Sequence, residues 1–252
     1  MTKLKKKVVV IGAGHNALTC ASYLAKSGFE VEVHESRSEV GGMACTREFT
    51  EGYKVPGVAH LLHMLNPNIQ KWLGLYKNGL EFAANRLKTI SLNPNGNALV
   101  IDGDHVEGDG ITDQHRAEFK SFKKKTNSLA QFFRSAYQIS PPRIRTDNRK
   151  DLLGLMQTGW NLRTMGNEGM TDMLRFIAIN VFDLLDEYLN DDFIKGSLAI
   201  DAVLGNHLGP RTNNSVITYL HSLTGEIDGV QGAYAIPKGG MSSYTDALKN
   251  SA

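Results

Sequence analysis

One short glycine-containing segment constrains the fold of this chain more than any other. Residues 8–11, Val-Val-Val-Ile, form a β-branched apolar run typical of a strand buried on both faces of a parallel sheet. The turn Gly-Ala-Gly-His-Asn-Ala follows at residues 12–17, and residues 18–26 then have the pattern of a helix. Apolar and polar residues alternate at 29–35. This order of strand, glycine turn, helix and strand predicts a β-α-β unit.

Each residue type in the turn has a physical role that suits a diphosphate ligand. Gly12 permits the sharp turn out of the strand, and Gly14 has no side chain to keep a pyrophosphate away from the backbone. Ala17 is small enough for close packing of the helix on the strand. The start of the helix adds free N–H groups and a partial positive charge. We therefore expect a phosphate-binding turn that comprises Gly12, Gly14, His15, Asn16 and Ala17.

The second strand ends at an acidic residue, which narrows the choice of ligand. Glu35 lies about twenty residues beyond the glycines, where a carboxylate can accept hydrogen bonds from a ribose 2′-hydroxyl. A carboxylate repels a 2′-phosphate, so Glu35 favours FAD or NAD over NADP. Ser36 and Arg37 follow immediately and are expected beside the adenine. A β-α-β unit without a ligand is the alternative.

A pair of glycines, Gly41-Gly42, comes soon after the second strand. Its backbone amides can approach the pyrophosphate, or the pair can serve as a hinge in an ordinary loop. Together, the glycine turn, Glu35 and Val40-Gly41-Gly42 resemble the FAD-binding N-terminus of the phytoene desaturase-like (phytoene dehydrogenase-related) flavoproteins, which are relatives of the amine oxidases. The subgroup that the chain resembles most is the pyridine nucleotide-disulfide oxidoreductase domain-containing proteins. Further segments match the motifs of this family in order, and these are Phe49–Gly57, Asp201–Gly205, Gly209–Arg211 and Pro237–Met241.

The resemblance implies an FAD-dependent oxidoreductase that transfers hydride between flavin and an apolar or amine-like organic substrate. It places Gly41, Gly42 and Met43 over the pyrophosphate and the ribityl side of FAD. His60 and His63 fall in a segment that the family has near the flavin ring, although ordinary packing also explains them. The sequence has no catalytic triad and no zinc-ligand spacing, which fits a reaction carried by the cofactor. No catalytic residue is identified.

Members of this family continue well past the segment Pro237–Met241, whereas this sequence stops at Ala252, inside a helix expected to begin at Ser242. The resemblance therefore implies roughly the N-terminal half of a family member, without the segment that contacts the flavin ring. Two alternatives to the enzyme follow. One is a non-catalytic dinucleotide-binding module that needs a complementing chain, and the other is an NAD-dependent dehydrogenase.

Composition excludes several other classes of protein. The 252 residues are 41% hydrophobic and 21% charged with a net charge of +2, which indicates a soluble globular protein without a nucleic-acid-binding surface. No apolar stretch approaches the ~20 residues of a transmembrane helix, and the N-terminus does not resemble a secretory signal. The cytoplasm is the expected compartment, or the mitochondrial matrix if the source is eukaryotic. Cys20 and Cys45 lack the close spacing of a redox-active pair.

The expected fold is α/β, with an inserted, mainly helical region that carries a β-hairpin. We expect a Rossmann-type FAD-binding domain at residues 1–80, a substrate-side region at 81–230 and a return towards the first domain at 231–252. The hairpin is expected at 88–103, around a turn rich in Asn and Gly. Helices are expected at 151–163, 171–179, 182–189, 191–204 and 213–223.

Thr112 is expected to cap a further helix with an apolar stripe. The stripe comprises Phe119, Phe122, Thr126, Leu129 and Phe133. Lysines lie mostly on the other faces of this helix, at Lys120, Lys123, Lys124 and Lys125. In one interpretation, the lysines form a solvated face and the apolar stripe packs in the core. In the other, the helix makes peripheral contact with a membrane or binds a lipophilic substrate. The expected partners are a small apolar substrate and, in addition, an oligomer or a complementing chain, with no metal and no nucleic acid.

Overall fold

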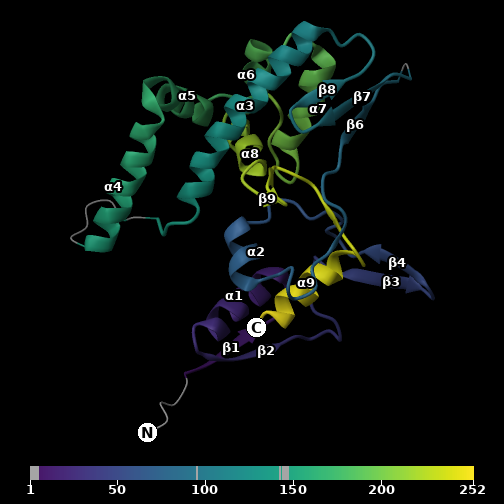
Figure 1. Cartoon of the computed structure of the whole chain (residues 1–252), viewed down its shortest axis with the longest axis vertical. Coiled ribbons are helices and arrows are strands. Elements are labelled where there is room, and N and C mark those ends of the chain that lie inside the picture. Colours follow the sequence, from purple (N-terminus) through teal and green to yellow (C-terminus); the bar gives the residue numbers. More distant parts are fainter. Residues whose placement is uncertain (1–5, 95, 142, 144–147) are drawn as a thin grey trace. The chain divides into compact units, whose positions relative to one another are not determined.

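The computed structural model describes residues 6–94, 96–141, 143 and 148–252. The chain divides into two compact units (Figure 1). The terminal unit consists of the chain up to Leu87 together with Gly225–Ala252, and the central unit is Lys88–Thr224. The chain thus leaves the terminal unit and returns to it, as an inserted region requires. The chain passes between the two units after Leu87 and after Thr224, whereas the expected boundaries lie after residues 80 and 230.

The terminal unit begins with the predicted β-α-β unit, which confirms the α/β fold class. Its elements are β1 (Lys7–Ile11), α1 (His15–Lys26) and β2 (Glu30–His34). The two strands are parallel, with Val8 opposite Val31. The helix begins three residues before the expected Leu18, because Gly14 is extended and its carbonyl accepts the N–H of Leu18 at 2.9 Å.

The expectation that β1 is buried on both faces is wrong for this chain. Val9 and Ile11 are 52% and 81% exposed, whereas Val8 and Val10, which alternate with them, are half-buried. In the described part of the chain, the sheet of β1 contains only β2, and α1 packs against these two strands. A parallel strand is buried on both faces only when both faces are covered. The face of β1 with Val9 and Ile11 is therefore open to solvent.

The other elements of the terminal unit come from both of its chain segments. The first segment contributes β3 (Thr46–Thr50), β4 (Tyr53–Pro56), α2 (Pro67–Leu73) and β5 (Phe82–Ala84). The second segment contributes β9 (Glu226–Ile227), β10 (Val230–Gln231), β11 (Ile236–Pro237) and α9 (Met241–Asn250). β3 pairs with β4 and β9 with β10, while β5 pairs with β11 across the two segments; all three pairs are antiparallel.

The core of the terminal unit joins residues that are distant in sequence. Leu73 in α2 and Leu248 in α9 are fully buried in one cluster. α9 packs against α1, where the hydroxyl of Ser22 donates to the carbonyl of Leu248 at 3.0 Å (Figure 1). The N–H of Leu87 donates to the carbonyl of Tyr234 at 3.1 Å, which keeps the chain in this unit as far as Leu87. The return of the chain after Thr224 is thus part of the same core.

The central unit carries the predicted hairpin and a group of helices. β6 (Thr89–Leu92) and β7 (Ala98–Asp102) form the hairpin, and β8 (His105–Glu107) adds a third antiparallel strand that the pattern did not indicate. The helices are α3 (Asp113–Ala136), α4 (Arg149–Thr164), α5 (Gly166–Ala178), α6 (Val181–Tyr188), α7 (Asp192–Val203) and α8 (Ser215–Ser222). Every expected helix is present, although α5 begins at Gly166 and not at Thr171.

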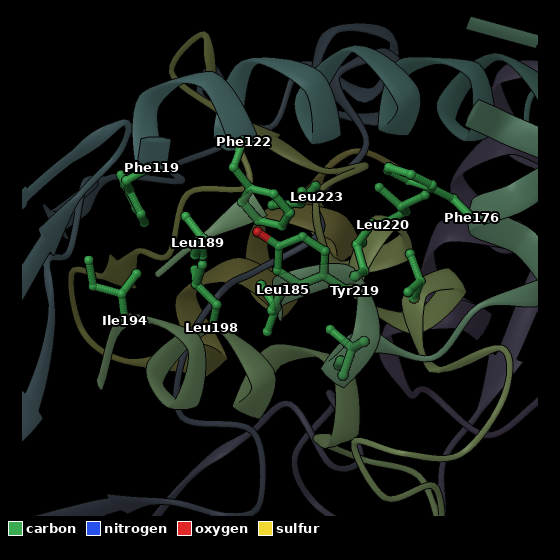
Figure 2. Packing of buried hydrophobic residues seen from close by; sticks show 14 of the residues in the cluster. Phe119, Phe122, Phe176, Leu185, Leu189, Ile194, Leu198, Tyr219, Leu220 and Leu223 are labelled. Atoms are coloured by element: carbon green, nitrogen blue, oxygen red, sulfur yellow. The ribbon is translucent and has the colours of Figure 1, made fainter. Parts of the chain in front are cut away.

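Aromatic rings lie within the core of the central unit (Figure 2). Phe122 of α3 stacks on Tyr219 of α8 with ring centroids 5.9 Å apart. Both rings are fully buried, as are Phe119 and Phe176. Aliphatic side chains from α6, α7 and α8 surround them, among them Leu185, Leu198 and Leu220 (Figure 2).

The helix predicted after Thr112 begins there, and its apolar stripe faces this core. The hydroxyl of Thr112 accepts the N–H of His115 at 3.2 Å, and Nδ1 of His115 accepts the N–H of Thr112 at 3.4 Å, which is a reciprocal capping box. Phe119, Phe122 and Leu129 are buried. The core therefore covers this stripe and makes it inaccessible to a membrane. In the described ranges, no helix has both the length and the apolar character to cross a bilayer.

Candidate cofactor site

The glycine turn lies at the carboxyl end of β1. The N–H of Gly12 donates to the carbonyl of His34 at 2.7 Å, which extends the pairing of β1 with β2. Gly12 has φ +90°, a conformation that residues with side chains rarely adopt. Gly14 is extended and immediately precedes α1. The chain thus passes from strand to helix between Ile11 and His15, as predicted.

The N-terminus of α1 presents backbone N–H groups that have no acceptor inside the helix. Because the first intrahelical bond runs from the N–H of Leu18 to the carbonyl of Gly14, the N–H groups of His15, Asn16 and Ala17 point out of the helix end. The first turn, which is fully described, contains no acidic side chain, and Gly14 cannot cap it through a side chain. This end of α1 is therefore suited to an anion such as a phosphate.

Glu35 ties the end of β2 to the glycine turn. Its Oε2 accepts the N–H of Ala13 at 2.7 Å, and its Oε1 accepts the N–H of Arg37 at 3.1 Å. The hydroxyl of Ser36 donates to the same Oε1 at 3.3 Å. The hydrogen bond from Ala13, followed by the one from Arg37, lowers the pKa of the Glu35 carboxyl below its ordinary value. A carboxylate accepts about four hydrogen bonds, so the ionised group retains capacity for a ribose hydroxyl.

The Gly41-Gly42 pair packs directly on the glycine turn. The N–H of Gly41 donates to the carbonyl of Ala13 at 2.7 Å, and Gly14 and Gly41 form an isolated parallel bridge. A Cβ on Gly42 would lie 3.2 Å from Cα of Gly14, which is closer than side chains normally pack. The structure therefore brings the two glycine segments into contact, and both this close approach and the positive φ of Gly42 favour glycine.

Residues that the sequence did not single out connect this site to α9. Thr46 donates its N–H to the hydroxyl of Ser242 at 2.8 Å, and the N–H of Ser242 donates to the hydroxyl of Thr46 at 3.2 Å. The hydroxyl of Thr245 would lie 2.8 Å from a Cβ on Gly41. The first turn of α9, and with it the end of the segment Pro237–Met241, thus lies beside the glycine pair. Thr46 and Ser242 are 196 residues apart, so no local pattern could have identified them.

The remaining predicted residues are exposed around this centre. Ser36, Arg37 and Met43 are all exposed. Arg37 and Gly42 line a pocket of about 490 Å³, together with Ser38, Glu39, Cys45, Arg47 and Glu48. Two arginines and two glutamates leave this lining without net charge. This lining therefore has no net positive charge to attract an anion, whereas the N-terminus of α1 has a partial positive charge.

The residues outside this centre have simpler roles. His63 stacks on Tyr234 with ring centroids 4.0 Å apart, next to the antiparallel bridge between Leu62 and Ala235. This stack joins the two segments of the terminal unit, so packing is sufficient to explain His63. Cys20 is an exposed free thiol and Cys45 a buried one. Among the described residues, no group of His, Cys, Asp or Glu is arranged to hold a metal ion.

Comparison with known proteins agrees with this geometry. Residues 10–76 match the family model of NAD(P)-binding Rossmann-like domains. The matched range contains the glycine turn, Glu35 and the glycine pair. The terminal unit thus contains a Rossmann-like domain of the kind that binds dinucleotides.

The whole chain is related to a longer protein. It is 29% identical over 261 residues to pyridine nucleotide-disulfide oxidoreductase domain-containing protein 2 of Rattus norvegicus, which covers 97% of this chain and 45% of the rat protein. A shorter match, 43% identical over 58 residues, relates 23% of this chain to 12% of the flavin-dependent L-tryptophan oxidase RebO of Lentzea aerocolonigenes. The structure of a putrescine oxidase has the same fold over 97% of this chain and 48% of its own, with a TM-score of 0.54 and 16% identity. The chain therefore spans less than half the length of its rat relative.

Proposed function

We propose that this chain carries the FAD-binding site of an oxidoreductase that transfers hydride between flavin and an apolar or amine-like organic substrate. The observation that carries the proposal is the contact of Glu35 with the glycine turn. At that point a ribose-binding carboxylate, an open helix N-terminus and a second pair of glycines meet. An adenine dinucleotide offers a diphosphate and an adjoining ribose to such a site.

Two observations favour FAD over NAD. The Gly41-Gly42 pair packs on the phosphate turn and adds backbone to it beyond the glycines that an NAD site needs. In addition, the name of one matched relative, RebO, describes it as flavin-dependent. NADP is disfavoured because Glu35 is ionised and would repel a 2′-phosphate. Kinship with the phytoene dehydrogenase-related enzymes, which the sequence motifs imply, is part of the proposal.

In this function the protein binds and orients, while the bound flavin supplies the hydride chemistry. The N–H groups of His15, Asn16 and Ala17 hold the phosphates, and Glu35 holds the adenosine ribose. Ser36 and Arg37 flank the adenine, and Gly41, Gly42 and Met43 cover the pyrophosphate and the ribityl side. The terminal unit is then the FAD-binding part of the protein and the central unit its substrate-side part. An apolar substrate is proposed from the resemblance, and an amine-like one is supported by the putrescine oxidase fold.

The cofactor that copurifies with the chain tests this proposal. We expect a yellow protein whose bound-flavin absorbance bleaches with dithionite, and whose released cofactor comigrates with FAD. Bound NAD in place of flavin would establish the dehydrogenase alternative. A colourless protein that does not respond to added FAD would contradict the proposal.

The open face of β1 favours a second candidate, a module that holds FAD only with a complementing polypeptide. Val9 and Ile11 lie exposed on a strand whose composition is that of a buried one. A polypeptide that covers them would complete the sheet beside the glycine turn. This candidate predicts weak FAD binding by the chain alone. Stable retention of FAD through size-exclusion chromatography would rule it out.

A further inference from the structure

α4 has no fully buried side chain, unlike the other helices of the central unit. Five of its large apolar residues are exposed to solvent, and Leu155 is the least exposed of them at 38%. Met156 is 71% exposed, Trp160 68%, Leu153 64% and Leu152 46%. Leu152, Met156 and Trp160 are spaced four residues apart, so they lie on one side of the helix. Leu162 packs against the core of the central unit, so α4 has a separate side for its own attachment.

The next helix repeats this arrangement. Met173 and Phe176 of α5 are fully buried and anchor it to the core. Met170, Leu174 and Ile177 have the spacing of a second helix face and are exposed. α4 and α5 contact each other at the periphery of the central unit (Figure 1). The pair therefore presents apolar surface outwards while other residues hold it in place.

Cationic residues lie on the same side of α4 as the exposed stripe. Arg149 is seven residues before Met156 and Arg163 is seven residues after it, a spacing that returns to the same helix face. Lys150 adds a third cation, and Asp151 is the single acidic residue in the helix. Apolar residues that include a tryptophan, flanked by arginines, are typical of helices that lie in the interface of an anionic membrane.

We infer that α4 is a membrane-interface helix. Its stripe of Leu152, Leu153, Met156 and Trp160 inserts at the boundary between headgroups and acyl chains of an anionic lipid surface. Arg149 and Arg163 reach the lipid phosphates from the two ends of the stripe, because long cationic side chains extend to the headgroups while their stems stay in contact with apolar surface. The proposed flavin site has no part in this inference.

A second copy of the chain is a less suitable partner for this stripe than an anionic membrane. Four such side chains present a few hundred Å² of apolar surface, whereas each partner in a stable complex buries about 800 Å². A symmetric antiparallel pair of α4 helices would also bring Arg149 of one copy close to Arg163 of the other. Repulsion between these like charges opposes such a dimer, whereas an anionic lipid surface attracts both arginines.

The fluorescence of Trp160 tests insertion directly. The sequence has two tryptophans, and the other, Trp72, stacks on Tyr23 in the terminal unit. Trp72→Phe keeps an aromatic ring in that stack and leaves Trp160 as the single tryptophan. Vesicles of phosphatidylcholine with about one third phosphatidylglycerol should shift its emission to the blue, and brominated acyl chains should quench it. The inference would be wrong if neither the phosphatidylglycerol vesicles nor the vesicles with brominated acyl chains changed the emission of Trp160.

Vesicle sedimentation of paired variants separates the stripe from the rest of the helix. Met156→Ser with Trp160→Ser should lower the fraction bound at least about tenfold. The matched control Gln157→Ser with Asn161→Ser changes two polar residues beside the stripe, removes no apolar side chain and should bind like the wild type. Arg149→Gln with Arg163→Gln should weaken binding and reduce its dependence on salt. Circular dichroism and the melting temperature establish that each variant is folded.

Two results would contradict the inference. One is equal vesicle binding by all three pairs of variants. The other is a wild-type dimer in sedimentation velocity that dissociates when Met156 and Trp160 are replaced, because the stripe would then be the contact between two copies.

Discussion

Ala13 donates its backbone N–H to Glu35 across the ends of β1 and β2, with 2.7 Å between the nitrogen and Oε2. The carboxylate that the sequence predicts to accept hydrogen bonds from a ribose is therefore also a structural link to the glycine turn. The carbonyl of the same Ala13 accepts the N–H of Gly41 at 2.7 Å. Through the N–H and the carbonyl of this one residue, the second strand, the glycine turn and the glycine pair are held together.

Replacement of Glu35 should weaken FAD binding. Glu35→Ala removes a charged acceptor, and we expect a loss of about 1–3 kcal/mol in binding free energy, roughly 5- to 150-fold in the dissociation constant. Glu35→Gln keeps an oxygen for the N–H of Ala13 and should lose less. Flavin fluorescence titration measures both. Glu30→Gln, an exposed residue of the same strand, is the matched control and should bind FAD normally. Equal affinities of Glu35→Ala and wild type would exclude Glu35 from the site.

A side chain at Gly42 should disturb the cofactor site by displacing Gly14. Gly42 has φ +61°, and an added Cβ would lie 3.2 Å from Cα of Gly14. Gly52 has φ +78° with open space around it, so Gly52→Ala has similar backbone strain without the contact. Each substitution should cost about 1–2 kcal/mol of stability. Only Gly42→Ala should also weaken FAD binding, by about tenfold or more in titration. A similar loss of affinity in Gly52→Ala would mean that strain, and not contact with Gly14, is responsible.

Gly225 should be one of the positions least tolerant of substitution. An added Cβ would overlap Cα of Met64 and lie 2.8 Å from the nitrogen of Leu65. These are backbone atoms, and Met64 already has φ +58°, so no side-chain rotation relieves the overlap. We expect Gly225→Ala to lower the free energy of unfolding by about 3 kcal/mol. Gly229→Ala, with φ +79° and open space, should cost about 1–2 kcal/mol. Scanning calorimetry compares the two, and equal melting temperatures would refute the packing argument.

His221 should make the stability of the central unit depend on pH. Its Nδ1 lies 3.0 Å from the hydroxyl of Tyr137, and burial lowers the pKa of the His221 imidazole from its ordinary value of 6.5. The unfolded chain then binds a proton more readily than the folded one. Stability should be at its full value above pH 6.5 and fall as the pH decreases from 6.5 through the lowered pKa. The difference in melting temperature between wild type and His221→Gln should therefore change across this range. A difference that is constant with pH would contradict the assignment.

Signals that act over a few residues were sufficient for much of the fold. Thr112 caps α3 as predicted because its hydroxyl and the backbone N–H that it accepts, that of His115, are three residues apart. The hairpin at 88–103 is confirmed because its turn residues and its alternating strands are adjacent in sequence. Two-residue strands such as β9 and β10 have too few residues for a recognisable alternation, and they form only because the returning chain packs in the terminal unit.

The candidate site divides in the same way. The position of the glycine turn between strand and helix, and that of Glu35 at the end of β2, could be predicted because strand, helix and strand fix their separation. The sequence leaves two interpretations of the Gly41-Gly42 pair open, contact with a pyrophosphate and a loop hinge, and neither includes the contact of Gly41 with Ala13, because a glycine pair alone does not define which surface it meets. Thr46, Ser242 and Thr245 could not be predicted, because their proximity depends on how the chain returns through α9.

The sequence by itself determined the order of elements, the positions of the turns and the residue types that suit a dinucleotide, because backbone sterics and side-chain periodicity operate within a turn or a strand. Only the tertiary structure decided which surfaces are covered. Large apolar residues are buried in α3 and exposed in β1 and α4, because burial depends on neighbours from distant parts of the chain. That dependence is the reason why Phe122 belongs to a core, whereas Ile11 and Trp160 are exposed to solvent.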